Sequence, residues 1–423
     1  MKNSEVSGGM PTLSRSARFA LAMILMTGVV LHTGCAREKP GDRASMPIRI
    51  GILQSLSGNM AESEKPLADA ALLAVEEINR AGGLLGRQVE AVVVDGRSDP
   101  KFSAKEAERL ITDEKVSAIF GCWTSACRKA VKEVVERRKS LLFYPLQHEG
   151  LEQSPNIIYT GSVPNQQAIP AARWAMDKFG KRLYLIGSDY VFPRTANLTI
   201  KEFGKLNNVS IVGEVYLPLG TADVKKAVDQ IVSLAPDVVI NTINGDTNHA
   251  FFEELSRRGV KAETTPVLSL SLAEVEISRD PKVFAGHYAA WSYFQSLDTT
   301  GNREFVNAFH QRFGKERMID DPMEASHIGV HLWAQAVKEA GDPDLEKIRN
   351  LILRQSLNAP QGIVSVDKGT NHLWRTPRIG RILVNGQFEV VWSSPITIRP
   401  TPFPQFHSKP EWLDLLAKEL RPQ

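Results

Sequence analysis

The sequence predicts an α/β protein made of two units, each a parallel sheet with helices on both faces. Short apolar, β-branched runs alternate with stretches whose apolar residues recur at helical spacing. Two such series follow one another and are separated at Gly161-Ser162-Val163-Pro164. The chain has 423 residues, 43% hydrophobic and 23% charged, which is a globular composition and a length that suits two or three folding units.

The first unit begins at Ile48, where a short apolar run predicts the first strand. Gly82-Gly83 ends the helix that follows it. The predicted strands are 48–53, 89–95, 116–120 and 141–144, and the predicted helices are 67–78, 101–114 and 125–139. Because strands and helices alternate at this interval, the strands are expected to run parallel.

The second unit repeats this rhythm without repeating the sequence. Its predicted helices are 166–179, 194–206, 224–234 and 249–257, and its predicted strands are 183–187, 211–216, 238–242 and 267–270. Further helices are expected over 303–313, 323–340 and 345–353, and a hairpin over 380–384 and 387–392 turns at Asn385-Gly386. These late elements suggest that the chain crosses back to the first unit.

The N-terminus predicts export. Arg15 and Arg18 precede an apolar run, Phe19 to Leu31, that is too short for a comfortable membrane span and fits a secretory signal. The run ends at L-H-T-G-C, which resembles the lipobox of bacterial lipoproteins and implies a lipid on Cys35. We therefore expect a signal peptide over 1–34, a lipidated tether over 35–47, and a periplasmic or cell-surface lipoprotein anchored to a membrane.

Several patterns argue against an enzyme, a cofactor, a metal or a nucleic acid. The net charge is only +3 and basic residues are scattered. The glycines of Ala81–Gly86 follow a helix, which is the wrong place for a dinucleotide loop. His327 and His331 are four residues apart on a predicted helix, but Ile328 replaces the Glu of the metalloprotease motif, so ordinary helix is expected. No G-x-S-x-G occurs.

The stretch Gly121 to Ala130, G-C-W-T-S-A-C-R-K-A, is the strongest candidate for a binding loop. It joins a predicted strand to a predicted helix, and ligands of open parallel sheets bind beyond the carboxyl ends of strands. Ser125 is expected to cap the helix. Cys122 and Cys127 are neither a C-x-x-C pair nor half of a four-cysteine zinc site. They could form a disulfide or stay as two buried thiols.

Polar and aromatic residues also follow other predicted strands. Tyr144 ends the last strand of the first unit and Gln147 follows it, and Tyr190 and Asp246 follow strands of the second unit. Any one of these segments could be an ordinary turn. Since two such units facing each other make a cleft, their joint position predicts a ligand site between the units.

Long motifs give the chain a recognisable resemblance. They include I-L-Q-S-L-S-G, G-C-W-T-S-A-x-R-K-A-V, L-L-F-Y-P-L-Q-H-E-G-L-E-Q-S-P-N-I, P-N-Q-Q, G-S-D-Y-V-F-P-R-T-A-N and N-G-D-T-N. Nearly all the chain after residue 47 resembles the substrate-binding lipoproteins of ABC transporters for urea and short-chain amides. These belong to the branched-chain amino-acid receptor group with the type I periplasmic-binding fold.

The resemblance implies two doubly wound lobes joined by hinge strands, with a ligand that closes the cleft between them. It implies a first lobe over 48–163 with a return segment at about 295–375, a second lobe over 164–294 with a return segment at about 376–400, and a tail over 401–423. The implied partners are a small ligand and the permease subunits of an ABC transporter. Two residues, Cys127 and His148, differ from what the urea branch leads us to expect.

Urea is flat and uncharged, and it needs acceptors for its N–H groups, donors for its oxygen, and aromatic walls. The residues expected to supply these are Trp123, Thr124, Ser125, Tyr144, Gln147, Tyr190, Asp246 and Glu274. In this scheme the rings form the walls, Asp246 and Glu274 accept from the ligand, and Ser125 serves its oxygen. A receptor for an amino acid or another small polar solute, or an amide-sensing regulator, is the alternative.

Overall fold

The computed structural model describes residue 8 and residues 46–420. The predicted signal peptide over 1–34 and the predicted lipidation site, Cys35, lie outside the described residues, as does most of the predicted tether. Over the described part of the chain, no helix combines the length and the apolar character needed to cross a bilayer.

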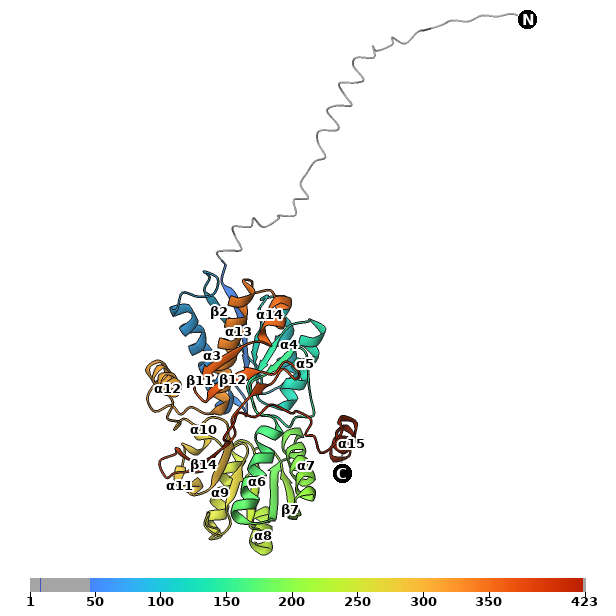
Figure 1. Ribbon diagram of the computed structural model, residues 1–423, viewed down its shortest axis with the longest axis vertical. Helices are drawn as coiled ribbons and strands as arrows, with labels where there is room; N and C mark the ends of the chain where they lie inside the picture. Colours follow the sequence, from blue (N-terminus) through green and yellow to red (C-terminus); the bar gives the residue numbers. More distant parts are fainter. Residues whose placement is uncertain (1–7, 9–45, 421–423) are drawn as a thin grey trace, which may run out of the picture. The chain divides into compact units, whose positions relative to one another are not determined.

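The first lobe is built on a five-stranded parallel sheet with the strand order β2-β1-β3-β4-β5. The part of the chain that supplies these strands is drawn in blue to green-blue in Figure 1. Its strands are β1 (Ile48–Gln54), β2 (Val89–Asp95), β3 (Ile119–Gly121), β4 (Leu142–Tyr144) and β5 (Ile157–Tyr159). The helices between them are α3 (Ala61–Arg80), α4 (Pro100–Thr112) and α5 (Ser125–Arg137). The predicted α/β alternation of this region is confirmed.

Both faces of this sheet are covered, because successive side chains of a strand point to opposite sides. Phe120 and Phe143 pack on one face with α3 and with α13 (Asp321–Ala340). Ile119 and Leu142 point the other way and pack with α4 and α5. Gly51 lets α4 approach the sheet, since a Cβ there would lie 2.8 Å from the Leu110 side chain.

The second lobe has a seven-stranded sheet with the order β15-β14-β10-β9-β8-β6-β7. It comprises β6 (Arg182–Ser188), β7 (Ser210–Leu217), β8 (Val238–Thr242), β9 (Val267–Ser269), β10 (Tyr288–Trp291), β14 (Arg378–Ile382) and β15 (Phe388–Ser393). The strands from β7 to β10 are parallel, whereas β14 is antiparallel to both β10 and β15. The predicted hairpin is therefore confirmed.

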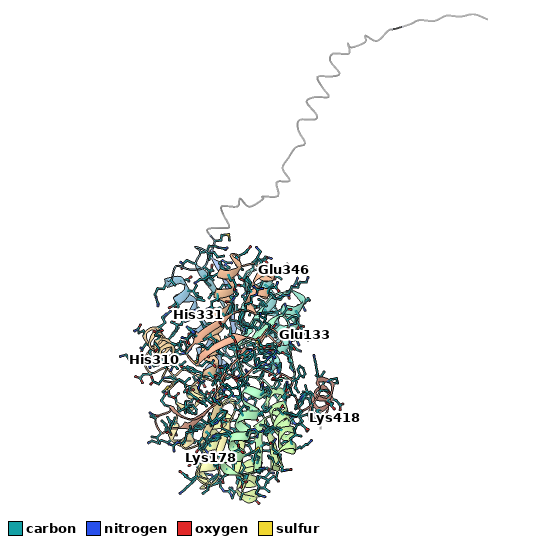
Figure 2. All side chains as sticks on the ribbon, in the orientation of Figure 1. Glu133, Lys178, His310, His331, Glu346 and Lys418 are labelled. Carbon is teal, nitrogen blue, oxygen red and sulfur yellow. A yellow bond between two sulfur atoms is a disulfide. The ribbon has the colours of Figure 1, made fainter. Side chains whose placement is uncertain are left out.

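Helices again cover both faces of this second sheet. They are η1 (Pro164–Gln166), α6 (Ala168–Phe179), α7 (Val191–Leu206), α8 (Lys225–Leu234), α9 (Thr247–Arg257), α10 (Glu274–Ile277) and α11 (Pro281–Phe284). Leu183 and Leu185 pack with α6 and α7, whereas Tyr184 and Ile186 pack with α8 and α9. Figure 2 shows the side chains that fill both lobes. The predicted fold class, two doubly wound lobes, is confirmed.

After β10 the chain returns to the first lobe, where α12 (Thr300–Phe313) and α13 lie against α3. The segments that follow are α14 (Leu345–Ile352), β11 (Ser356–Ala359), β12 (Gly362–Val366), β13 (Leu373–Trp374) and, after the second lobe's hairpin, α15 (Lys409–Glu419). The strands β11 to β13 form a small antiparallel sheet. The strands β5, β10 and β11 to β13 were not predicted, since strands of two to five residues are too short to show a period. The helix α15 was not predicted either.

The chain passes between the two large sheets three times: after β5, after β10, and between β13 and β14. Side chains of these three passages contact one another. Ser162 Oγ lies 3.1 Å from Ser292 Oγ, which joins the first passage to the second. Asp321 Oδ2 accepts hydrogen bonds from the N–H groups of Ser292 and Tyr293 and from Arg375 Nη2 at 3.0, 2.8 and 2.7 Å. The buried ion pair of Asp321 and Arg375 therefore joins the second passage to the third.

A buried carboxyl near the cleft makes stability depend on pH. Glu64 on α3 is 3% exposed, and its Oε2 accepts the N–H of Ser55 at 2.5 Å. Burial raises its pKa from 4.5 to about 7, although the bonds with Ser55 oppose this. Because the folded pKa is the higher one, stability is fully present below about pH 4.5 and is lost as the pH rises through 7.

We expect Glu64→Gln, which stays neutral, to gain about 3 kcal/mol relative to wild type between pH 4 and pH 8, since one pKa unit corresponds to about 1.4 kcal/mol. Urea denaturation of both proteins across this range measures the difference. The exposed Glu263 provides the matched control, Glu263→Gln, which should show no such trend. A difference between Glu64→Gln and wild type that does not change with pH would contradict this account of Glu64.

Candidate functional site

The loop after β3 is shaped by a close approach of two strands. A Cβ at Gly121 would lie 1.9 Å from the carbonyl oxygen of Leu53 on β1, so only glycine allows the strands to come this close. Cys122 then adopts a φ of 66° and forms a disulfide with Cys127. Of the two alternatives left open by the sequence, two buried thiols is therefore wrong. The turn brings Trp123, which is 7% exposed, to the end of the sheet.

The start of α5 differs from the prediction. Thr124, and not Ser125, caps the helix, because Thr124 Oγ1 accepts the N–H of Cys127 at 3.2 Å. Ser125 instead donates its hydroxyl proton to Glu149 Oε2 at 2.7 Å and accepts from Arg128 Nη1 at 3.2 Å. Since that proton is already engaged, Ser125 is placed to act as an acceptor and not as the expected donor to a ligand oxygen.

Five of the eight residues predicted for the site line one cavity. The cavity is small, with about 10 Å³ open to the centre of a water-sized sphere, and it lies where the loops of the first lobe meet the strand ends of the second. Its lining residues are Trp123, Ser125, Tyr144, Leu146, Gln147, Tyr190, Phe192 and Asn244. The contact of Gln147 Nε2 with the carbonyl oxygen of Leu270, at 3.2 Å, links the two lobes beside it. The expected convergence of strand ends from both lobes is thus present in the structure.

The structure does not bring Asp246 and Glu274 into this cavity. Asp246 precedes α9 with a side chain 73% exposed, and it pairs with Arg279 Nη1 at 2.9 Å. Arg279 also pairs with Glu62 of the first lobe, so this group forms a bridge between the lobes. Glu274 is fully buried, and its Oε1 accepts the N–H of Gln295 at 2.8 Å. Glu274 Oε2 has no hydrogen-bond partner among the described residues, but neither Glu274 nor Asp246 lines the cavity.

A buried charge cluster lies behind the cavity, and sequence reasoning missed it. Arg128 is fully buried and donates to Glu149 Oε1 at 2.8 Å and to Glu152 Oε1 at 3.0 Å. Burial acts to raise the pKa of Glu152, but the Arg128 charge, its hydrogen bond and the other groups around Glu152 together outweigh burial, and the pKa falls to about 2. The Arg128 guanidinium also lies 4.9 Å from the Tyr144 ring centre, which fixes that ring.

Two histidines continue this buried layer. Gly150 N–H donates to His148 Nδ1, His148 Nε2 lies 3.0 Å from His372 Nε2, and His372 Nδ1 lies 2.7 Å from the carbonyl oxygen of Thr370. These contacts fit two neutral imidazoles. His148 accepts at Nδ1 and donates from Nε2 to His372, and His372 donates from Nδ1 to Thr370. Burial lowers the pKa of both well below 6.5, and the Arg128 charge lowers the pKa of His148 further. His148 thus supports the site from behind, stacked on Tyr159.

The cavity offers aromatic rings and acceptors but no free charge. None of its eight lining side chains is ionised at neutral pH, within the part of the chain that the structure describes. Gln147 Oε1 is buried and has no hydrogen-bond partner among the described residues. Such an atom is costly unless it is paired. The site is therefore complementary to a small ligand that donates hydrogen bonds from N–H or O–H groups.

The sequence of this chain is similar to a known protein family and to several named proteins. Residues 48–409 match the family model described as a periplasmic binding protein domain. A Brucella abortus protein named Leu/Ile/Val-binding protein homolog 6 is 22% identical over 334 residues, which cover 77% of this chain and 85% of that protein. A 121-residue stretch is 36% identical to a Geobacillus stearothermophilus protein named limonene hydroxylase, but it covers only 28% of this chain and 22% of that one.

Solved structures agree with the fold. A Rhodopseudomonas palustris solute-binding protein of an ABC transporter, in complex with 3,4-dihydroxybenzoic acid, superposes with a TM-score of 0.75 at 20% identity, covering 84% of this chain and 99% of that one. A Streptococcus pneumoniae branched-chain amino-acid substrate-binding protein, in complex with isoleucine, gives 0.70 at 19% identity and covers 83% and 100%.

Proposed function

We propose that this chain, which belongs to the periplasmic binding protein family, is the substrate-binding component of an ABC transporter. Its ligand is urea or a short-chain amide, which is held in the cavity between the lobes and delivered to the permease subunits. The relatives that match most of the chain are named as binding proteins and not as enzymes. In this proposal Trp123, Tyr144 and Tyr190 form the walls of the site.

The observation that carries the proposal is the unpaired acceptor in an uncharged cavity. Gln147 Oε1 has no protein donor among the described residues, and the Ser125 hydroxyl already donates its hydrogen bond to Glu149, which leaves Oγ as an acceptor. Urea and simple amides carry N–H donors and no charge, so they satisfy these oxygens without burying an ion. A site built in this way rejects analogues that leave its buried polar atoms unpaired.

An amino acid is the second candidate, favoured by the names of the Brucella and Streptococcus relatives. Its carboxylate would need a cation. Arg128, a buried cation that contacts the lining residue Ser125, is already held by Glu149 and Glu152. An anionic ligand would therefore have to displace carboxylates from Arg128, which argues for the neutral ligand.

Calorimetric titration of the purified protein with urea, formamide, acetamide and leucine tests the assignment. We expect saturable binding of urea or one of the amides, and about thirtyfold weaker binding after Trp123→Ala, since losing one buried aromatic wall costs about 2 kcal/mol. Trp392→Ala is the control because Trp392 is a half-buried tryptophan of the second lobe that lies outside the cavity. Leucine binding without amide binding would refute the proposed ligand.

The export signal is also part of the proposal. We expect the mature chain to begin at a lipid-modified Cys35, because a charged start, an apolar run and Gly34-Cys35 follow in order. Cys35→Ser should move the protein from the membrane fraction to the soluble extracytoplasmic fraction. Fractionation with immunodetection and mass spectrometry of the N-terminus measure this. A wild-type chain that is soluble and keeps residues 1–34 would contradict the prediction.

The disulfide is expected to be dispensable for recognition. Neither Cys122 nor Cys127 lines the cavity, whereas their neighbours Trp123 and Ser125 do. Replacing both cysteines with Ser should leave the affinity for the ligand within about threefold, because less than about 1 kcal/mol of contact energy is at stake. Calorimetry on the double variant measures the affinity, and circular dichroism checks its fold. Loss of binding by a folded double variant would assign the disulfide a direct part in shaping the site.

A further inference from the structure

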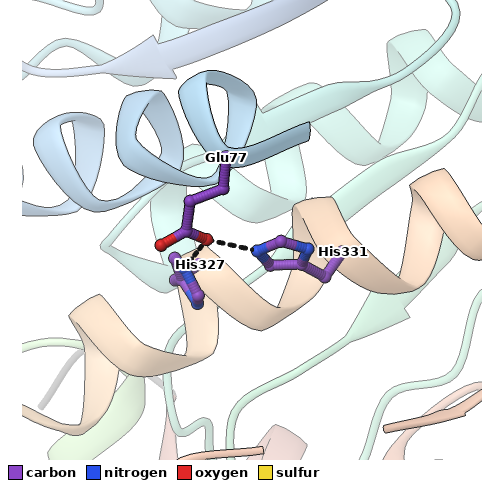
Figure 3. A group of neighbouring side chains, drawn as sticks. All are labelled: Glu77, His327 and His331. Carbon is purple, nitrogen blue, oxygen red and sulfur yellow. Dashed lines mark hydrogen bonds and ion pairs between the residues drawn. The ribbon is translucent and has the colours of Figure 1, made fainter. Parts of the chain in front are cut away.

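Three side chains on two helices of the first lobe converge outside the ligand cavity. Glu77 lies on α3, and His327 and His331 lie one turn apart on α13 (Figure 3). The Nε2 atoms of both histidines lie 2.8 Å from the same atom, Glu77 Oε2. One ligand atom from each residue falls within 4.8 Å of the others. The two imidazoles and the carboxylate therefore face a common point.

The packing of α3 on α13 holds this arrangement in place. The Ser326 hydroxyl donates to the carbonyl oxygen of Leu67 at 3.0 Å, which fixes the two helices against each other. The Phe305 ring, 4.5 Å from the His327 ring, covers the inner side. His327 is buried, whereas the side chains of His331 and Glu77 are 25% and 24% exposed. The cluster thus has a rigid inner wall and an opening to solvent.

Hydrogen bonding alone leaves this cluster incomplete. His327 Nδ1 is buried and has no hydrogen-bond partner among the described residues. As neutral imidazoles, both histidines donate from Nε2 to one carboxylate oxygen only if both Nδ1 atoms lack protons, and the buried Nδ1 of His327 is then an acceptor without a protein partner. With Nε2 bound to a cation, Nδ1 would instead carry the proton, as the second ring nitrogen of a metal-bound histidine usually does.

We propose that Glu77, His327 and His331 bind a divalent transition-metal ion of the zinc type. Two imidazole nitrogens and one carboxylate oxygen are a ligand set that Zn²⁺ accepts, and imidazole disfavours Mg²⁺ and Ca²⁺. Ligands about 2.0 Å from a tetrahedral zinc lie roughly 3.3 Å apart, so the observed 2.8 Å contacts need to open only slightly. The solvent-facing side leaves a fourth position for water.

The bound ion would link parts of the lobe that are distant in the sequence. Glu77 and His327 are separated by 250 residues, and α13 begins at Asp321, the carboxylate that joins the passages between the lobes. The ion would therefore hold the helix that starts at the hinge against the first helix of the lobe. Its expected effect is on stability, since an ion that binds only the folded chain stabilises it.

The test is titration of the chelator-treated, dialysed protein, purified without a histidine tag, with ZnCl₂ and with MgCl₂ as the comparison. We expect one Zn²⁺ per chain, no detectable Mg²⁺ binding, and a rise of a few degrees in the thermal unfolding midpoint with Zn²⁺ only. The visible absorption of the Co²⁺-loaded protein should show the intense bands of a tetrahedral site.

Glu77→Gln and His331→Gln alter the half-buried ligands, and each should weaken Zn²⁺ binding at least tenfold. His249→Gln is the matched control, because His249 pairs with Glu253 at 3.2 Å on a helix surface but has no second histidine; its affinity should equal that of wild type. Absence of Zn²⁺ binding by wild type overturns the proposal. Equal Zn²⁺ affinity in all four proteins also overturns it, since the ion would then bind elsewhere. If a variant fails to fold, two measurements on the wild-type protein still test the proposal. These are the visible absorption of the Co²⁺-loaded protein and the rise in the thermal unfolding midpoint with Zn²⁺ but not Mg²⁺.

Discussion

Replacing Arg375 with Met is expected to lower the free energy of unfolding by about 3–5 kcal/mol, because it leaves buried carboxylates without their cation. Arg375 is fully buried, and its Nη2 lies 2.7 Å from Asp321 Oδ2 and 3.5 Å from Glu324 Oε2. Its Nη1 also donates to the carbonyl oxygen of Thr160 at 2.7 Å. One substitution therefore removes the cation and the donor that join two passages between the lobes.

The loss should be larger at pH 8 than at pH 5. Burial raises the pKa of Glu324 to about 7, while Arg375 holds that pKa down. Without Arg375 the folded pKa rises further, so the variant loses more stability as the pH climbs through and above 7. Denaturation of the two proteins in urea at both pH values gives the difference.

Arg381→Met is the matched control. Arg381 on β14 and Glu389 on β15 form an ion pair across the hairpin, with 2.6 Å between Arg381 Nη2 and Glu389 Oε2. Their side chains are 47% and 51% exposed. A pair of this kind contributes at most about 1 kcal/mol. If Arg375→Met lowers the free energy of unfolding no more than Arg381→Met does, the bonds between Arg375 and Asp321 do not join the passages between the lobes in the way we describe.

Replacing Arg128 with Met is expected to have a comparable cost in stability, about 3–5 kcal/mol, and to weaken ligand binding as well. Glu149 and Glu152 would lose their buried partner, and Ser125 would lose the donor at 3.2 Å. Ser125 and Tyr144 line the cavity, so the binding groups would no longer be fixed. We expect about tenfold weaker urea binding, which corresponds to one lost charge-assisted hydrogen bond.

Lys129→Met controls for the loss of positive charge in the same turn of α5. Lys129 Nζ lies 3.9 Å from Glu149 Oε1, but its side chain is 43% exposed, so little change in stability or affinity is expected. Denaturation and calorimetry are run at a temperature at which all three proteins are folded. Normal urea affinity in a folded Arg128→Met variant would mean that the buried cluster does not shape the cavity.

Much of the fold follows from local patterns in the sequence. The strands around Ile50 and Val239 are recognisable because their apolar β-branched runs are bounded by turn residues, and the hairpin at Asn385-Gly386 because this pair suits a tight turn. The same reasoning located the loop of Trp123 and the residues after β4, since the carboxyl ends of parallel strands share one edge of a sheet. These features depend on neighbours a few residues away.

Other features depend on partners that are far apart in the sequence. The sequence assigned Ser125 to the helix cap, but the structure pairs its hydroxyl with Glu149, 24 residues away. Asp246 was expected in the site, but Arg279, 33 residues away, holds it at an exposed bridge. Short strands such as β5 and β10 are set by pairing with their neighbours and not by their own three or four residues.

By itself, the sequence determined the α/β class, the two lobes and the loops that meet at the cleft, because apolar periodicity fixes which face of each element is buried. Only the tertiary structure decided the pairing of Cys122 with Cys127, the engagement of Arg128, and the meeting of Glu77 with His331 across 254 residues. The physical reason is that a polar side chain takes the partner that packing brings within hydrogen-bond distance, and that partner leaves no periodic trace in the chain.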